Sequence, residues 1–320
     1  MKKKVLYAFT CAFLLTGCNI LSIENNGNPV EKQSPIQFFV QMEKETLSFP
    51  TTKSIPENTI GEPTSTIEDP NKDADLNELC KTLEYVVFKE EENSPILIKH
   101  RQYTYDESNL DVDFGIVYDT LPTGNYTFYF LAHNSETATL SGSTFSFDQI
   151  SDSFYKAIPL EIAVAETINE DVTLQRIVSR IEFMATDPIT TRLKQFNMEI
   201  EGSFNQLDLT TGYGIQSSTP ETFTYLFKEE EIGKNNHIHG FYTFVPESEE
   251  YIATQLSAID QNNELIRTRI IDNILPERNK IIRYKGRLYS RSESDNTFQI
   301  SIYNNGEWKE TSEIVLPEYE

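Results

Sequence analysis

Residues 121–132 read Leu-Pro-Thr-Gly-Asn-Tyr-Thr-Phe-Tyr-Phe-Leu-Ala, and this stretch decides the fold class. Aromatic and β-branched residues fill it from Tyr126 onward, which is typical of a strand within a sheet. The proline and glycine that precede Tyr126 predict a turn from which the strand starts. The stretch therefore predicts β structure, and the rest of the chain repeats the pattern.

Strand signals recur at short intervals along the whole chain, with few stretches of helical periodicity. The mixed segment 145–155 leaves room for a short helix, and Asn304-Asn305-Gly306 predicts a hairpin turn. The succession predicts an all-β protein made of two antiparallel β-sandwich domains in series, at residues 36–168 and 169–320. The predicted strands are 36–42, 83–88, 96–98, 114–118, 126–132, 172–184, 196–200, 223–227, 237–245, 254–259, 265–271, 280–288, 298–303 and 314–316.

The amino terminus predicts a signal for export. Lys2, Lys3 and Lys4 precede an apolar run from Val5 to Leu15, which is too short to span a bilayer. The run ends in Leu15-Thr16-Gly17-Cys18, which resembles the lipobox of bacterial lipoproteins. We therefore expect a signal peptide at residues 1–17 and a lipid on Cys18. The alternative is an ordinary signal peptide with a chance cysteine.

The residues after Cys18 predict a membrane-attached chain without a disulfide. A polar tether is expected at residues 18–35, and a proline-rich exposed connection at residues 49–79. Cys80 is the single other cysteine of the mature chain, so stability must come from packing. The formal net charge of −23 disfavours nucleic acid as a partner, so membrane contact is expected through the lipid.

Catalytic and metal-binding patterns are missing from the sequence. We therefore expect no enzyme, no cofactor and no metal site. His237 and His239 are spaced to point the same way from a strand, as two metal ligands would, but a polar strand end is the favoured interpretation. His100 and His133 have no evident partner, and the glutamate runs 90–92 and 229–231 fit solvated loops better than calcium sites.

Four features together resemble the fimbrillin superfamily of Bacteroidales, and most closely its FimB/Mfa-type branch of fimbrial anchor and minor subunits. They are the lipobox at Cys18, the early strand Ile36–Gln41 followed by a Thr/Ser/Pro stretch and Leu83–Phe88, the strand entry Leu121–Tyr129, and the arginine-bearing strand Leu174–Glu182. The resemblance implies two transthyretin-like β-sandwiches and a place in a surface fimbria. Fimbrillin-type structural or tip subunits are the partners it implies, joined by addition of a β-strand.

Subunits that polymerise in that family lose their first strand to an arginine-specific protease. This chain has no arginine between Cys18 and Arg101, although lysines at 32, 44 and 53 leave a lysine-specific cut possible. The resemblance therefore implies a subunit that keeps its lipid and its first strand, as an anchor or accessory subunit at the outer membrane and the cell surface. Low arginine content is the alternative explanation.

Three further readings of the chain stay open. The carboxy-terminal hairpin Phe298–Leu316 is a candidate donor or contact element for a partner, or simply the last hairpin of its domain. A glycan-binding outer-membrane lipoprotein of a polysaccharide-uptake system is the alternative function. It would need an exposed aromatic platform near Trp308 or at Tyr126–Phe130. A lipoprotein hydrolase ranks last, because no nucleophile and base are paired.

Overall fold

The computed structural model describes residues 32–43, 75–92, 94–106, 113–164, 166–291, 298–304 and 314–316. Strands dominate these ranges, with one short α-helix and one 3-10 helix. The bounds are β1 Gln33–Met42, α1 Leu76–Leu79, β2 Thr82–Lys89, β3 Ile96–Thr104, β4 Ile116–Pro122, β5 Gly124–His133, β6 Ala138–Ser141, β7 Thr144–Phe147, β8 Ser153–Ile162, β9 Ile168–Arg176, β10 Val178–Ala185, β11 Leu193–Glu201, β12 Phe204–Asp208, β13 Tyr213–Gln216, β14 Glu221–Leu226, η1 Glu229–Glu231, β15 Ile238–Phe244, β16 Ile252–Asp260, β17 Leu265–Ile274, β18 Lys280–Gly286, β19 Phe298–Asn304 and β20 Ile314–Leu316.

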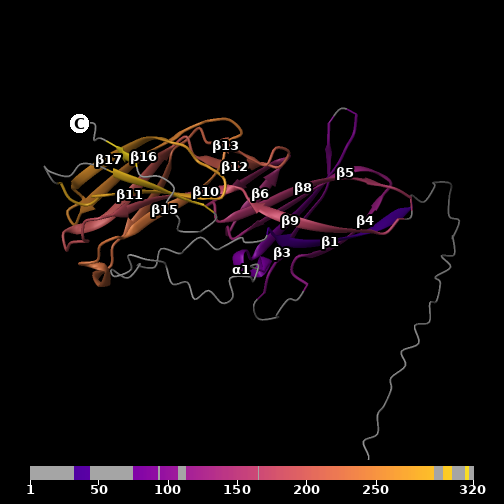
Figure 1. The fold of residues 1–320 in the computed structure, drawn as a ribbon, viewed down its shortest axis with the longest axis horizontal. Coiled ribbons are helices and arrows are strands. Elements are labelled where there is room, and N and C mark those ends of the chain that lie inside the picture. Colours follow the sequence, from indigo (N-terminus) through magenta and orange to yellow (C-terminus); the bar gives the residue numbers. More distant parts are fainter. Residues whose placement is uncertain are drawn as a thin grey trace, which may run out of the picture.

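The first half of the chain forms a seven-stranded sheet in the order β3-β2-β5-β8-β9-β1-β4 (Figure 1). In β5, Tyr126, Phe128 and Phe130 are almost completely buried on one face. Tyr129 and Leu131 point to the other face, because side chains alternate along a strand, and they pack into a second core. The sheet therefore has apolar contacts on both faces of β5.

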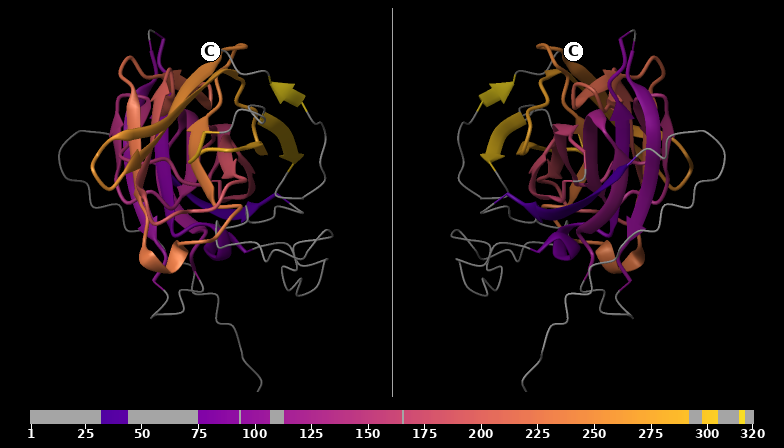
Figure 2. Two further views of the ribbon diagram at one scale, coloured as in Figure 1. Left: turned by 90° about the vertical axis from the view of Figure 1, so that its left-hand side faces the viewer. Right: turned by 90° about the vertical axis from the view of Figure 1, so that its right-hand side faces the viewer.

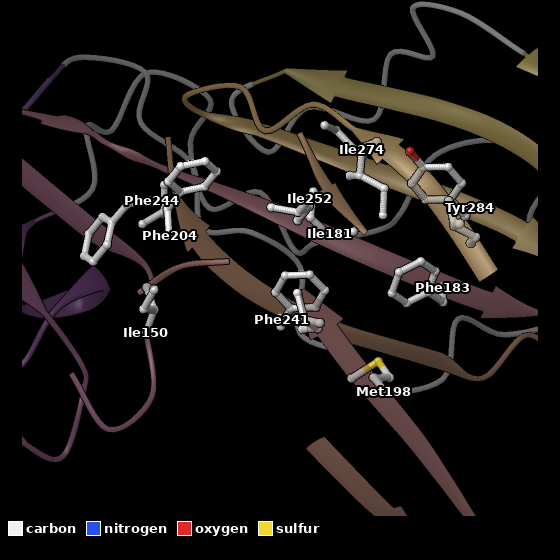
Figure 3. Close-up of a cluster of buried hydrophobic side chains, with 14 of the residues drawn as sticks. Ile150, Ile181, Phe183, Met198, Phe204, Phe241, Phe244, Ile252, Ile274 and Tyr284 are labelled. Carbon is white, nitrogen blue, oxygen red and sulfur yellow. The ribbon is translucent and has the colours of Figure 1, made fainter. Parts of the chain in front are cut away.

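The second half forms a five-stranded sheet, β15-β10-β18-β19-β20, and a four-stranded sheet, β14-β11-β16-β17. Their facing side chains build the larger core, part of which is drawn in Figure 3. Ile181 and Phe183 of β10, in the five-stranded sheet, share this core with Met198 of β11 and Ile252 of β16, in the four-stranded sheet. This arrangement is a sandwich of two sheets.

A small sheet, β13-β12-β7-β6, connects the two halves. β6 and β7 come from the first half, and β12 and β13 from the second, so that Leu207 pairs with Phe145. The Phe147 ring lies 5.3 Å from that of Phe244. The halves lie end to end along the long axis in Figure 1, and the two end-on views of Figure 2 show their sheets overlapping. The larger core is thus shared between the halves.

The all-β prediction is confirmed, and most of the predicted strands are present. The antiparallel expectation holds for most pairs, but β1–β9 and β10–β18 are parallel. The predicted domain division at residue 169 falls at the start of β9, which belongs to the first sheet through Arg176. The division into two domains, at residues 36–168 and 169–320, stays a prediction.

Three local predictions were wrong. The segment 145–155 holds strand residues of β7 and β8 rather than a helix. The single strand predicted at 172–184 is two strands, interrupted at Ile177, whose N–H donates to the carbonyl of Ser153 at 3.0 Å. Of the exposed or partly disordered connection predicted at 49–79, the structure describes only residues 75–79, and these hold helix α1, where Leu76 and Leu79 are buried.

Candidate attachment strand and assembly edge

Strand β1 is the first described element after the predicted lipid site, and it lies inside the seven-stranded sheet. It pairs with β4 on one side, antiparallel, and with β9 on the other, parallel, over seven residue pairs each. Alternation along the strand sends Ile36, Phe38, Val40 and Met42 into the core. The early strand predicted from the sequence is therefore present, with the predicted buried face.

Phe38 is the centre of the buried face of β1. Its ring centroid lies 4.9 Å from that of Phe128, 5.0 Å from that of Phe130 and 6.0 Å from that of Tyr85. Such tilted and edge-on contacts add to the burial of apolar area. The amino-terminal strand is thus packed against the very stretch that decides the fold.

Both ends of β1 are also fastened by polar contacts. The hydroxyl of Ser34, which is completely buried, donates to the carbonyl of Ala163 at 2.8 Å. At the other end the N–H of Glu43 donates to the carbonyl of Leu174 at 3.0 Å. Near the middle, the Val40 N–H donates to the carbonyl of Gly115 at 2.8 Å. Fraying from either end of the strand therefore breaks hydrogen bonds to neighbouring segments of the chain.

The outer strands β3 and β4 of this sheet are joined by side chains. The Asp119 carboxylate on β4 accepts a hydrogen bond from the Tyr85 hydroxyl at 2.7 Å and pairs with the Lys99 ammonium on β3. Arg101 NH1 donates to the carbonyl of Tyr118 at 3.1 Å. Burial, and then the neighbouring Asp119 charge, raise the pKa of Tyr85 far above its ordinary value, so it stays a donor. The two edge strands of the seven-stranded sheet, β3 and β4, are thus bridged by side chains.

The carboxy-terminal hairpin lies where the last hairpin of its domain is expected, which is one of the two alternatives given by the sequence. β19 pairs with β18 over six residue pairs, and β20 pairs with β19 over three. β20 is the outermost strand of the five-stranded sheet in the described part of the chain. The hairpin is therefore the end of this sheet, and its last strand is held by the fewest pairs within it.

A groove of about 890 Å³ lies where the two halves meet. Ser135 and Ile150 line it from the first half, and Phe223 and Phe241 from the second. Arg180 and Arg283 line its wall and pair with the buried Glu182 carboxylate behind them: Arg283 Nε donates to it at 2.7 Å, and Arg180 Nε lies 2.9 Å from its other oxygen, within ion-pair distance. Buried charges persist only when they are paired in this way, so the wall is a fixed structural feature.

His239 is part of the core of the second half. His239 Nε2 lies 2.7 Å from the Tyr289 hydroxyl, and its ring stacks on Phe196 with centroids 4.1 Å apart. Burial, followed by the nearby His237, lowers the pKa of His239 well below its ordinary value. In the described ranges no three His, Cys, Asp or Glu side chains are grouped as metal ligands. The predicted polar strand end fits His237, which is half-buried just before β15, but is wrong for His239, which is buried within that strand.

Glu84 is a partner that sequence reasoning missed for His100 and His133. Its completely buried carboxylate lies 2.6 Å from His100 Nε2 and 3.5 Å from His133 Nε2, and it accepts from Gln102 at 2.7 Å. Burial raises the pKa of Glu84, but hydrogen bonds from His133, Gln102 and His100 outweigh it and leave the pKa lowered. One acidic residue inside the apolar run 83–88 was the available signal.

Several predicted sites lie outside the described residues, namely Cys18 and Trp308, together with the signal peptide and most of the tether. The aromatic platform predicted at Tyr126–Phe130 is excluded, because Tyr126, Phe128 and Phe130 are at most 1% exposed. Cys80 is a free, buried thiol, and burial raises its pKa well above the ordinary value. No helix in the described ranges has the length and apolar character needed to cross a membrane.

Known proteins were compared with the chain in three ways. No curated protein matches it. Among solved structures, the fimbrial anchor protein Mfa2 from Porphyromonas gingivalis is 11% identical, with a TM-score of 0.47, covering 90% of this chain and 100% of its own. The tip fimbrial protein Mfa3 from the same organism, with a C-terminal truncation, is 9% identical, with a TM-score of 0.40, covering 85% and 99%.

Those solved structures include an anchor and a tip subunit of fimbriae, the kinds of protein to which the sequence was compared above. A family model matches residues 118–317, which is more than half of the chain. The chain therefore belongs to the family of unknown function DUF6562.

Proposed function

We propose that this protein is a non-enzymatic, lipid-anchored accessory subunit of a surface fimbria. Cys18 would hold it on the outer membrane, and a fimbrillin-type structural or tip subunit would join it by β-strand addition. The observation that carries the proposal is the position of β1, between β4 and β9. A force on the lipid reaches the fold through this strand.

The geometry of β1 suits that role. Its two ladders run along the strand, so a pull on its amino-terminal end loads fourteen residue pairs together rather than one after another. The buried Phe38 and the Ser34 hydrogen bond oppose sliding of the strand. The chain also lacks arginine between Cys18 and Arg101, which supports a lipid that stays joined to both predicted domains.

β20 is the element we assign to the partner. An outermost strand presents unpaired N–H and C=O groups that can accept another strand, and a strand held by three pairs is the easiest in its sheet to exchange. Pairing at β20 would place the partner in the five-stranded sheet of the second half, while β1 connects the lipid to the first. Attachment and assembly would then use different sheets.

Cell fractionation tests the attachment. Cys18→Ala should move the chain and its partner subunit from the membrane fraction to the soluble fraction. Cys11→Ala, which changes the other cysteine of the signal segment, is the matched control and should leave both on the membrane. Membrane retention of the Cys18→Ala chain would overturn lipid attachment.

Co-purification tests the pairing. Val315→Pro removes a backbone donor from β20 and should abolish recovery of the partner subunit while the chain stays on the membrane. Val315→Thr keeps the strand and should retain the partner. Undiminished recovery with a folded Val315→Pro chain would remove β20 from the assembly site.

A further inference from the structure

A second pocket, of about 600 Å³, lies at the far end of the second half, and its charge is opposite to that of the chain as a whole. Three arginines line it, Arg192, Arg287 and Arg291, in a protein whose formal net charge is −23. They come from two loops, one after β10 and one after β18. Arginines converge in this way where planar or tetrahedral oxyanions are recognised.

The arginines keep most of their charge unpaired. Arg192 NH2 lies 3.3 Å from the Asp260 carboxylate, but its side chain is 66% exposed. In the described part of the chain, neither Arg287 nor Arg291 has a carboxylate within ion-pair distance. Arg287 NH2 donates to the Ser290 hydroxyl at 2.8 Å, and Arg291 Nε to the Ile266 carbonyl at 3.2 Å. These neutral acceptors orient the guanidinium groups without cancelling their charge.

The neighbouring acidic side chains, Asp187 and Asp260, already accept hydrogen bonds from other donors. Asp187 is 2% exposed, and its carboxylate accepts from the N–H groups of Leu288, Tyr289 and Ser290 at 2.7–3.0 Å. It also accepts from the Ser290 hydroxyl at 2.7 Å. Asp260 likewise accepts two backbone N–H groups of its own turn. Asp187 therefore serves to hold the loop that carries Arg287 and Arg291.

The loop that carries Arg287 and Arg291 is also held in the core by Tyr289, so the pocket is preorganised. The Tyr289 ring is buried, and its hydroxyl meets His239 in the core. Arg287 Nε is buried and has no hydrogen-bond partner among the described residues. Burying a donor without an acceptor is unfavourable, so an oxyanion that reaches this group gains more than it would from an exposed arginine.

We propose that this pocket binds an oxyanion, a carboxylate or a sulfate, carried on a small organic ligand. The volume is far larger than a bare ion needs and lies within the range of small-molecule sites. Pro188 and Leu265 supply apolar wall beside the arginines, and the Leu265 residue is 55% exposed. Ser290 and Thr190 add hydroxyl groups, so the site combines charge, hydrogen bonding and apolar contact.

Calorimetric titration of the full chain with simple sugars measures how much the negative charge of the ligand contributes to binding. Glucuronate and glucose 6-sulfate should bind saturably, and glucose, which lacks the anionic group, should not. Sodium sulfate should compete only weakly. Rising salt should weaken binding, because screening reduces the attraction between charges. Comparison of glucuronate with glucose 6-sulfate shows which oxyanion the pocket prefers.

Arg192→Gln and Arg291→Gln should each weaken binding roughly tenfold, and the double variant should abolish it, since each removes one charge-assisted contact. Lys156→Gln, at an exposed position of β8, is the matched control and should bind as the unchanged chain does. Thermal unfolding verifies that each variant is folded. No saturable binding of either anionic sugar, equal binding of glucose, sulfate binding as tight as that of the sugars, or unchanged binding in the double variant would overturn the proposal.

Discussion

At the scale of single residues, the buried Glu182 carboxylate is a charge whose loss should destabilise the fold. It is 1% exposed and pairs with both Arg180 and Arg283. Glu182→Gln leaves the two guanidinium groups buried beside a neutral amide, and we expect it to lower the free energy of unfolding by about 3 kcal/mol. Urea denaturation measures the loss. Glu201→Gln, at an exposed position of β11, should change stability little; similar values for the two variants would contradict a structural role for the triad.

His239 should make the stability of the protein depend on pH below neutrality. Burial, and then His237, lower its pKa below the ordinary value of 6.5, so the folded state favours the neutral ring. Below pH 6.5 the unfolded chain binds a proton that the folded chain refuses, and the free energy of unfolding falls, by at most about 1.4 kcal/mol per pH unit. Glu84, whose pKa is lowered from 4.5, contributes only at more acidic pH.

A paired substitution isolates that effect. His239→Phe with Tyr289→Phe removes both members of the buried hydrogen bond together and keeps two rings in the core, so stability at pH 7.5 should change little. The loss of stability between pH 7.5 and pH 5.0 should then become smaller. Tyr289→Phe alone keeps the histidine and should keep the pH dependence. An unchanged slope in the double variant would mean that other groups titrate in this range.

At the scale of elements, β1 can be tested through two neighbouring phenylalanines. Phe38 is completely buried among three aromatic rings, whereas Phe39 points to the opposite face and is 39% exposed. Phe38→Ala should lower the free energy of unfolding by about 3–5 kcal/mol, because it removes a large side chain and leaves a cavity. Phe39→Ala, one residue away in the same strand, should cost far less. Equal losses in urea denaturation would show that the strand is not held by its buried face.

A strand is easier to predict from the sequence when one of its faces is exposed to solvent and the other is buried. β1 alternates between buried and exposed side chains, so its pattern in the sequence indicated a strand and its inner face. β10 is buried at every position, including Arg180 and Glu182, so no alternation in its sequence indicates which side faces a core. Charged residues in a strand normally indicate the solvent face, and the ion pairs that reverse this come from β18, a hundred residues away.

At the scale of the whole molecule, the connection between the halves could not be read from the sequence. β6 and β7 lie within the first half of the chain and pair with each other, but β7 also pairs with β12, at residues 204–208. The parallel pairing of β1 with β9 is similarly long in range. Strand periodicity indicates where a strand lies and which side faces a core, but not which strand it meets. The candidate attachment strand was therefore predictable, whereas its neighbours were not.

The lack of arginine before Arg101 gives a prediction that concerns the whole chain. An arginine-specific protease should leave Cys18 and residues up to at least 100 covalently joined, so the lipid stays with β1 and β2 on a denaturing gel. Lys44→Arg keeps the charge but places a cleavage site just after β1, and the lipid-bearing piece should then separate on that gel. Without denaturant the cleaved chain should still sediment with membranes, because fourteen residue pairs and the buried Phe38 hold β1 in place. Release of the cleaved body in native buffer would show that β1 alone cannot hold the fold to its lipid, and the anchoring role would then depend on an uncut chain.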